Sequence, residues 1–93
     1  MRADQSDQPE RCRLYWDYYG PSAQGTAQHF LVHLQAWLQK EGMHEQADEL
    51  GVHTLSTHHS LVICSLPLEM GRLAYKVLKA NRAVAIETQT TED

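Results

Sequence analysis

One stretch decides the fold: Leu14-Tyr15-Trp16-Asp17-Tyr18-Tyr19, followed directly by Gly20-Pro21. Its aromatic residues are typical of a β-strand, and a Gly-Pro pair ends a strand and opens a turn or helix. A second apolar run, residues 61–66, also ends at a proline, Pro67, and is followed by a helical pattern. This repeated succession of strand, proline and helix predicts a split β-α-β sandwich, an α+β fold.

Two segments have the apolar spacing of amphipathic helices. Residues 21–41 place their large apolar side chains on one stripe, and Gly42 is a natural stop at the C-terminal end. Residues 67–80 repeat the pattern, and Asn81 is expected to cap this helix in the left-handed conformation. The expected apolar stripe of the second helix consists of Met70, Leu73, Ala74, Val77 and Leu78.

The rest of the chain supplies three further strands. Residues 52–57 and 60–66 are predicted to form a hairpin that turns near His58-His59. Residues 82–87 alternate Val84 and Ile86 with alanines and predict a short edge strand. The acidic segment 44–50 is expected to form one helical turn.

The resulting order, β-α-β-β-α-β, resembles the ferredoxin-like sandwich in layout. That resemblance implies four antiparallel strands in the order 4-1-3-2, with both helices on one face of the sheet. The aromatic first strand and the apolar third strand would then be central. The layout is shared by many unrelated functions, so it does not assign one.

Composition limits the classes of function. The chain has 93 residues, 42% of them hydrophobic, and a formal net charge of −4. We expect one domain over residues 11–87, with flexible tails at 1–10 and 88–93. The negative charge argues against a nucleic-acid partner, and no apolar stretch is long enough for a membrane span or a secretory signal. We therefore expect a cytoplasmic protein.

Strand alternation predicts what each face of the sheet carries. Leu14, Trp16 and Tyr18 are assigned to the core. Arg13, Tyr15, Asp17 and Tyr19 are assigned to the face without helices. The third strand is apolar on both sides, which indicates that this open face has a second cover. We expect that cover to be another copy of the chain, joined through the open face or the edge strands. The expected interface residues are Tyr15, Asp17, Tyr19, Leu61 and Ile63.

Six histidines and two cysteines raise the question of metal binding. His29 and His33, four residues apart, would lie on one side of the first helix, and two solvated side chains are the simpler interpretation. A second group would gather at one edge of the sheet and could hold zinc, copper or nickel: Cys12, Cys64, His53 and His44. Nothing in the spacing of these residues requires a site, and buried reduced thiols or a disulfide are alternatives for the two cysteines.

Catalysis is a third possibility. Asp17, Tyr15, Tyr19 and His53 could gather over the open sheet, as in cofactor-free enzymes of the dimeric ferredoxin-like kind, by analogy alone. The segment 20–26 lacks the lysine of a phosphate loop and the spacing of a dinucleotide fingerprint. The sequence therefore favours a small noncatalytic interaction or regulatory module, with a metal-binding protein and a small enzyme as alternatives. It identifies no cofactor and no small-molecule or protein partner.

Overall fold

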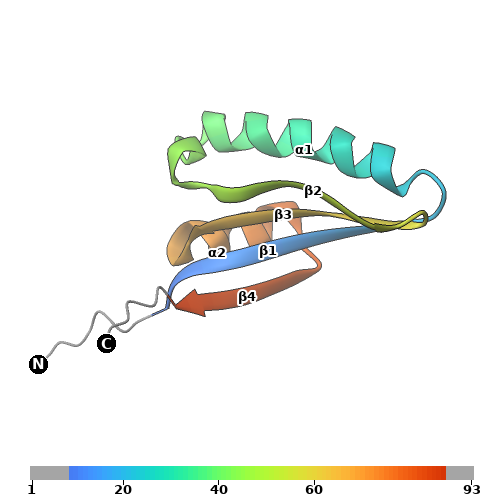
Figure 1. Ribbon diagram of the computed structural model, residues 1–93. Helices are drawn as coiled ribbons and strands as arrows, with labels where there is room; N and C mark the ends of the chain where they lie inside the picture. The colour runs from blue at the N-terminus through green and yellow to red at the C-terminus, as the bar shows by residue number, and fades with distance from the viewer. Residues whose placement is uncertain (1–8, 88–93) are drawn as a thin grey trace, which may run out of the picture.

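The computed structural model describes residues 9–87. Four strands and two α-helices succeed one another along the chain, with a short 3-10 helix, η2, after the first α-helix (Figure 1): β1 Pro9–Tyr19, α1 Ala23–Lys40, η2 His44–Gln46, β2 Asp48–Ser56, β3 His59–Pro67, α2 Leu68–Leu78 and β4 Arg82–Glu87. The expected α+β class is confirmed. The predicted tails lie outside the described residues, except that β1 already begins at Pro9.

All strand pairs are antiparallel, and the strands lie in the order β2-β3-β1-β4. The central pair, β1 and β3, is in register from Arg11 opposite Pro67 to Tyr19 opposite His59. In Figure 1, α2 lies behind β3 and β1, so this view looks onto the side of the strands away from that helix. The hairpin turn uses Thr57 and His58, because β2 ends at Ser56 and β3 begins at His59.

One face of the sheet forms the hydrophobic core, as the alternation of β1 predicts. Leu14 and Trp16 are fully or almost fully buried there, and both helices pack on this side. The Trp16 ring lies 5.0 Å from the Phe30 ring of α1. Its indole N–H donates a hydrogen bond to the Leu78 carbonyl of α2 at 3.0 Å. Trp16 thus joins β1 to both helices.

Helix α2 approaches β1 very closely at Gly71. A Cβ atom at this position would lie 2.7 Å from the Cβ of Cys12, a distance at which something must shift. Glycine is therefore required by the spacing between helix and sheet rather than by an unusual backbone conformation. The neighbouring Ala74, also buried, has the same effect of keeping the helix close to the strands.

The two helix ends differ in how well the sequence predicts them. Gly42 adopts a positive φ of 74° just after α1, as expected. The expected cap at Asn81 is wrong: the left-handed residue is Lys79, with φ 57°, whose N–H donates to the Tyr75 carbonyl. Asn81 instead contacts β1, where its N–H donates to the Tyr15 carbonyl at 2.8 Å. Helix α2 ends at Leu78, two residues before the predicted end at residue 80, and the following residues lead into β4, which pairs with β1.

The predicted apolar stripe of α2 is only partly buried. Gly71 and Ala74 face the sheet, whereas Leu73 and Val77 are exposed. Met70 and Leu78 of the predicted stripe are partly buried against the core, so the packed side of α2 combines these two residues with the small Gly71 and Ala74. Within residues 9–87, neither helix combines the length and the apolar content needed to cross a membrane.

Candidate functional site

The open face of the sheet, meaning the side opposite the helices, carries every residue expected at an interface. The register places Tyr15 opposite Ile63, Asp17 opposite Leu61, and Tyr19 opposite His59. Tyr19 is 71% exposed, whereas Leu61 is only 4% exposed and therefore offers almost no surface to a partner. On β4, this face carries Arg82, Val84 and Ile86, because they pair with Tyr15, Arg13 and Arg11.

Arg13 and Glu49 form an ion pair that crosses the sheet. The Arg13 Nε and Nη2 atoms donate to Glu49 Oε1 and Oε2 at 2.7 and 3.0 Å. Arg13 lies on β1 and Glu49 on β2, so the two side chains meet above β3. The hydrogen bond from Arg13 holds the pKa of Glu49 below its usual value. The same bond raises the pKa of Arg13, so both groups are charged at neutral pH.

Glu49 reaches this position through a distorted segment of β2. The pairing of β2 with β3 shifts register between Asp48 and Gly51, and Glu49 has a φ of 55°. A residue other than glycine, asparagine or aspartate is rare in this left-handed region. The distortion turns the carboxylate toward Arg13, and backbone strain of this kind concentrates at functional surfaces.

Arg11 forms a second crossing of β3. Its Nε donates to the Ser65 hydroxyl at 3.0 Å, and its Nη2 donates to the carbonyls of Ser65 and Gln46 at 2.9 and 2.8 Å. The same nitrogen lies 3.2 Å from a carboxylate oxygen of Asp48. Ser65 is consequently buried although it lies on the open face. Part of the cover that the sequence analysis assigned to a second chain is therefore supplied by this chain's own arginine.

Asp17 forms a second cluster of polar contacts on the open face, with His59 on β3 and Arg82 on β4. Its side chain is 8% exposed, with His59 Nε2 at 2.9 Å and Arg82 Nη2 at 3.2 Å from one carboxylate oxygen. The backbone N–H of Asp17 donates to the Asn81 side-chain oxygen at 2.6 Å. Side chains from β3 and β4 thus meet at the carboxylate of Asp17 on β1, while the loop before β4 is held to the backbone of the same residue. These contacts fix the rotamers of the neighbouring side chains.

Two aromatic rings lie against these charged groups. The Arg82 guanidinium stands 4.4 Å above the centre of the Tyr15 ring, the geometry of a cation–π interaction. The Tyr19 ring is stacked on the His59 ring with centres 4.4 Å apart. Tyr15 and Tyr19 are therefore held in place by their own strand neighbours, without any ligand.

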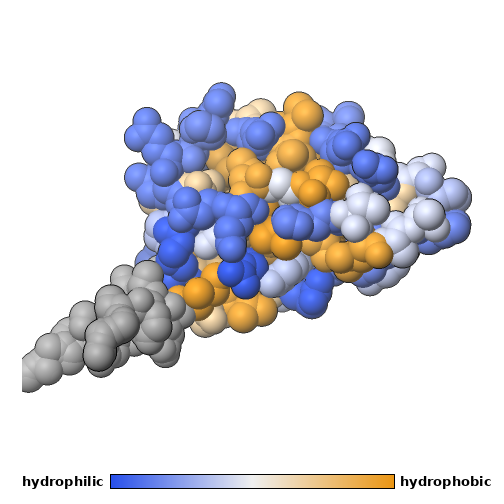
Figure 2. Space-filling model, in the orientation of Figure 1, coloured by the Kyte–Doolittle hydropathy of each residue, from blue (hydrophilic) through white to orange (hydrophobic). Residues whose placement is uncertain are grey.

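Apolar surface remains between the polar contacts. Val84 is 47% exposed, and Ile63 and Ile86 are half-buried. Figure 2, which has the orientation of Figure 1, shows orange apolar patches separated by blue hydrophilic ones. The open face therefore combines exposed apolar side chains with charged side chains held in ion pairs. It is less apolar than the sequence predicts.

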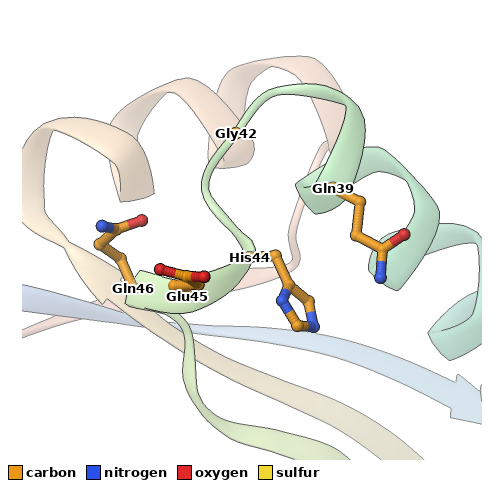
Figure 3. Close-up of a pocket in the computed structure, with 5 residues that line it drawn as sticks. All are labelled: Gln39, Gly42, His44, Glu45 and Gln46. Carbon is orange, nitrogen blue, oxygen red and sulfur yellow. The ribbon is translucent and has the colours of Figure 1, made fainter.

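Two shallow hollows lie on the open face, and a third lies at the C-terminal end of α1. One, of about 470 Å³, is lined by Arg13, Tyr15, Glu49, Leu50, His53 and Ile63. A neighbouring one, of about 450 Å³, is lined by Arg11, Arg13, Asp48, Glu49, Ser65 and Ile86. The third, of about 350 Å³, follows α1 and is lined by Gln39, Gly42, His44, Glu45 and Gln46, whose labelled side chains point in different directions (Figure 3). Asp17 and His59 line none of the three.

The four expected metal ligands are not brought together. Cys12 and Cys64 lie on the helix side of the sheet, because Cys12 is opposite Leu66 and Cys64 is opposite Leu14. His53 is opposite Leu61 and so lies on the open face. His44 lies in η2, outside the sheet. Among residues 9–87, no three histidine, cysteine or acidic side chains lie close enough to share a metal ion.

The two cysteines are buried and free rather than disulfide-bonded. Burial raises the pKa of the Cys64 thiol to about 12, and it also raises the pKa of Cys12. Thiols with raised pKa values are poor nucleophiles and poor metal ligands at neutral pH, because the thiolate is the reactive form. Buried reduced thiols, one of the alternatives considered from the sequence, describe both residues.

The sequence analysis placed Arg13 on the open face but missed Arg11, Arg82 and the ion pairs that the three arginines form there. The alternation in β1 places Arg11, Arg13 and Asp17 on one side, which is a usable signal. Which residues of β2 and β4 they contact depends on the strand register and on the bulge at Glu49. Neither can be predicted from the local sequence pattern.

Comparison with known proteins does not assign the chain to a family. No family model matches it, and no curated protein and no solved structure is significantly similar to it.

Proposed function

We propose that this protein is a small noncatalytic interaction or regulatory module that forms a homodimer through the open face of its sheet. The observation that carries the proposal is the combination of exposed apolar side chains and fixed charges on that face. Tyr19 is 71% exposed and Val84 47% exposed, beside ion pairs that hold Arg13 and Asp17 in place. Rigid aromatic anchors among satisfied polar groups are typical of interfaces.

The charge pattern also suits a second copy of the same chain. A two-fold symmetric interface needs a surface that is complementary to itself. The open face carries three arginines, Arg11, Arg13 and Arg82, and three acidic residues, Asp17, Asp48 and Glu49. Neither sign dominates, so two copies can approach without strong repulsion.

The affinity is expected to be modest. Tyr19, Val84 and the half-buried isoleucines would each bury only part of their surface in a dimer. Each Å² of apolar surface removed from water contributes about 25 cal/mol to the binding free energy. Association costs several kcal/mol in lost freedom of motion, so a small mixed interface gives a transient dimer with Kd roughly micromolar.

Edge pairing is the alternative route to a dimer, and the two edges are not equivalent. β2 has register shifts between Asp48 and Gly51 and between Thr54 and Ser56, and such irregularities oppose pairing with another chain. β4 is regular from Arg11 opposite Ile86 to Tyr15 opposite Arg82. If edges contribute, we expect β4 rather than β2 to pair.

We also infer that the fold is of the ferredoxin-like kind. The element order β-α-β-β-α-β supports this, as does the strand order β2-β3-β1-β4, which is 4-1-3-2 when read from the other edge. An antiparallel sheet with helices on one side leaves its other face open to solvent or to a partner, which is consistent with the proposed role.

Sedimentation equilibrium of three variants tests the proposal. Tyr19→Glu puts a charge on the open face and is expected to abolish the dimer, and Val84→Lys is expected to weaken it. Val32→Lys is the matched control, because Val32 is an equally apolar, 62% exposed residue on α1. A dimer that survives Tyr19→Glu would exclude the open face and leave pairing through β4. A monomeric wild-type protein at millimolar concentration would remove the proposal.

A further inference from the structure

Two histidines on α1 lie in direct contact outside the open face. His29 and His33 are one helical turn apart and both are exposed. Their Nε2 atoms are 3.1 Å apart, and their rings meet edge to face with centres separated by 4.6 Å. Two imidazole nitrogens, each able to ligate a metal, therefore already lie next to each other on the exposed side of α1.

The distance between these nitrogens matches that between two ligands of one ion. With metal–nitrogen bonds of about 2.0 to 2.1 Å, two imidazole nitrogens lie about 2.9 Å apart at a right angle and about 3.4 Å apart at a tetrahedral angle. The observed 3.1 Å falls between these values. An ion could replace the hydrogen bond between the rings without any change in the helix.

We propose that His29 and His33 chelate one divalent transition-metal ion on the surface of α1. Imidazole nitrogen is a good ligand for copper, nickel and zinc, and Cu²⁺ is expected to bind most tightly of these. The helix holds both ligands at fixed spacing, so binding the second ring costs little additional entropy. Water completes the coordination, which makes this an open, exchangeable site rather than a structural one.

This site is distinct from the Cys12, Cys64, His53 and His44 group considered from the sequence, whose members lie apart. It is also independent of the proposed dimer, because α1 packs on the face of the sheet opposite Tyr15 and Tyr19. Either proposal can fail without the other.

Calorimetric titration of the full-length, tag-free protein with Cu²⁺ tests the proposal. The wild type is expected to bind one ion at a site that His29→Gln and His33→Gln each weaken by on the order of a hundredfold, because a single imidazole loses the chelate effect. His44→Gln is the matched control, since His44 is exposed but has no histidine neighbour in contact. Equal affinities for the wild type and both chelate variants would overturn the proposal, as would an equal loss in the control.

Two further readouts identify the ligands without relying on affinity. Electron paramagnetic resonance of the copper-loaded wild type is expected to show coupling to two imidazole nitrogens, and to one in either chelate variant. Cu²⁺ is also expected to raise the Tm of the wild type but not of His33→Gln, because only a ligand that binds the folded helix stabilises it. A two-nitrogen spectrum that persists in both variants would contradict the assignment.

Discussion

Arg13 of β1 and Glu49 of β2 are joined by two hydrogen bonds, of 2.7 and 3.0 Å, although β3 separates their strands. The pair ties the three strands together across the open face. The backbone of Glu49 is left-handed at this point, with φ 55°. A conformation this unusual for glutamate is maintained only where surrounding contacts determine it.

The first prediction concerns stability in acid. The pKa of Glu49 is lowered in the folded protein from its ordinary value of 4.5, so the unfolded state binds the proton first. The stabilising contribution is therefore complete above about pH 5 and is lost as the pH falls through the lowered value. Glu49→Gln is expected to show a smaller loss of unfolding free energy between pH 5 and 2 than the wild type, measured by urea denaturation. If the free energy of unfolding fell equally in both proteins between pH 5 and 2, the ion pair would contribute nothing to stability.

The second prediction compares two glycines in helices. Gly71→Ala is expected to destabilise the protein by about 1 to 3 kcal/mol, because the new Cβ would meet Cys12 at 2.7 Å. Gly25→Ala on α1 meets nothing within 4 Å and is expected to stabilise by up to about 1 kcal/mol. Chemical denaturation measures both. A Gly71→Ala variant that is as stable as the wild type or more stable would mean that α2 is not packed this closely on β1.

The third prediction concerns the buried thiols. Because burial raises the pKa of Cys64 to about 12, the folded protein retains the proton at a pH where the unfolded chain has lost it. Stability is therefore expected to fall as the pH rises from about 9 toward 12, and Cys64→Ala is expected to reduce this alkaline loss.

At pH 8, both thiols should react with a disulfide reagent only as fast as the protein unfolds. Rapid labelling of native protein would contradict the burial of both residues.

The fourth prediction tests Asp17 as the organising carboxylate. Asp17→Asn leaves the side chain similar in size but removes the charge that faces His59 and Arg82, and it is expected to cost about 1 to 3 kcal/mol. Glu69→Gln is the control, because its contact with Arg72 is 3.8 Å long and exposed, and its effect is expected to be below about 0.5 kcal/mol. Denaturation midpoints at pH 7 compare the two. If the two substitutions lowered stability equally, the charge of Asp17 would not organise its neighbours on the open face.

Much of the fold follows from patterns in the sequence. Alternation along β1 predicts that Leu14 and Trp16 are buried and that Tyr15 and Asp17 lie on the other side, because side chains in a strand alternate between faces. The stop at Gly42 is predictable because glycine tolerates positive φ. These features depend on neighbouring residues alone.

The features that sequence could not predict depend on register. The bulge between Asp48 and Gly51 sets which face each later residue of β2 occupies, and it places His53 on the side away from Cys64. The same bulge creates the ion pair with Arg13. Leu73 shows a related limit: its spacing suits the buried stripe, but the close packing at Gly71 turns it toward solvent.

The central claim is that the open face of the sheet holds two copies of this chain together. Its most direct test is a dilution series followed by NMR, from about 1 mM to 10 μM, with the mass checked against twice 10.6 kDa. A dimer formed through the open face is expected to give concentration-dependent chemical-shift changes at Tyr19, Ile63 and Val84, and none at Val32 on α1. Spectra that do not change with concentration, or changes confined to the helices, would contradict it.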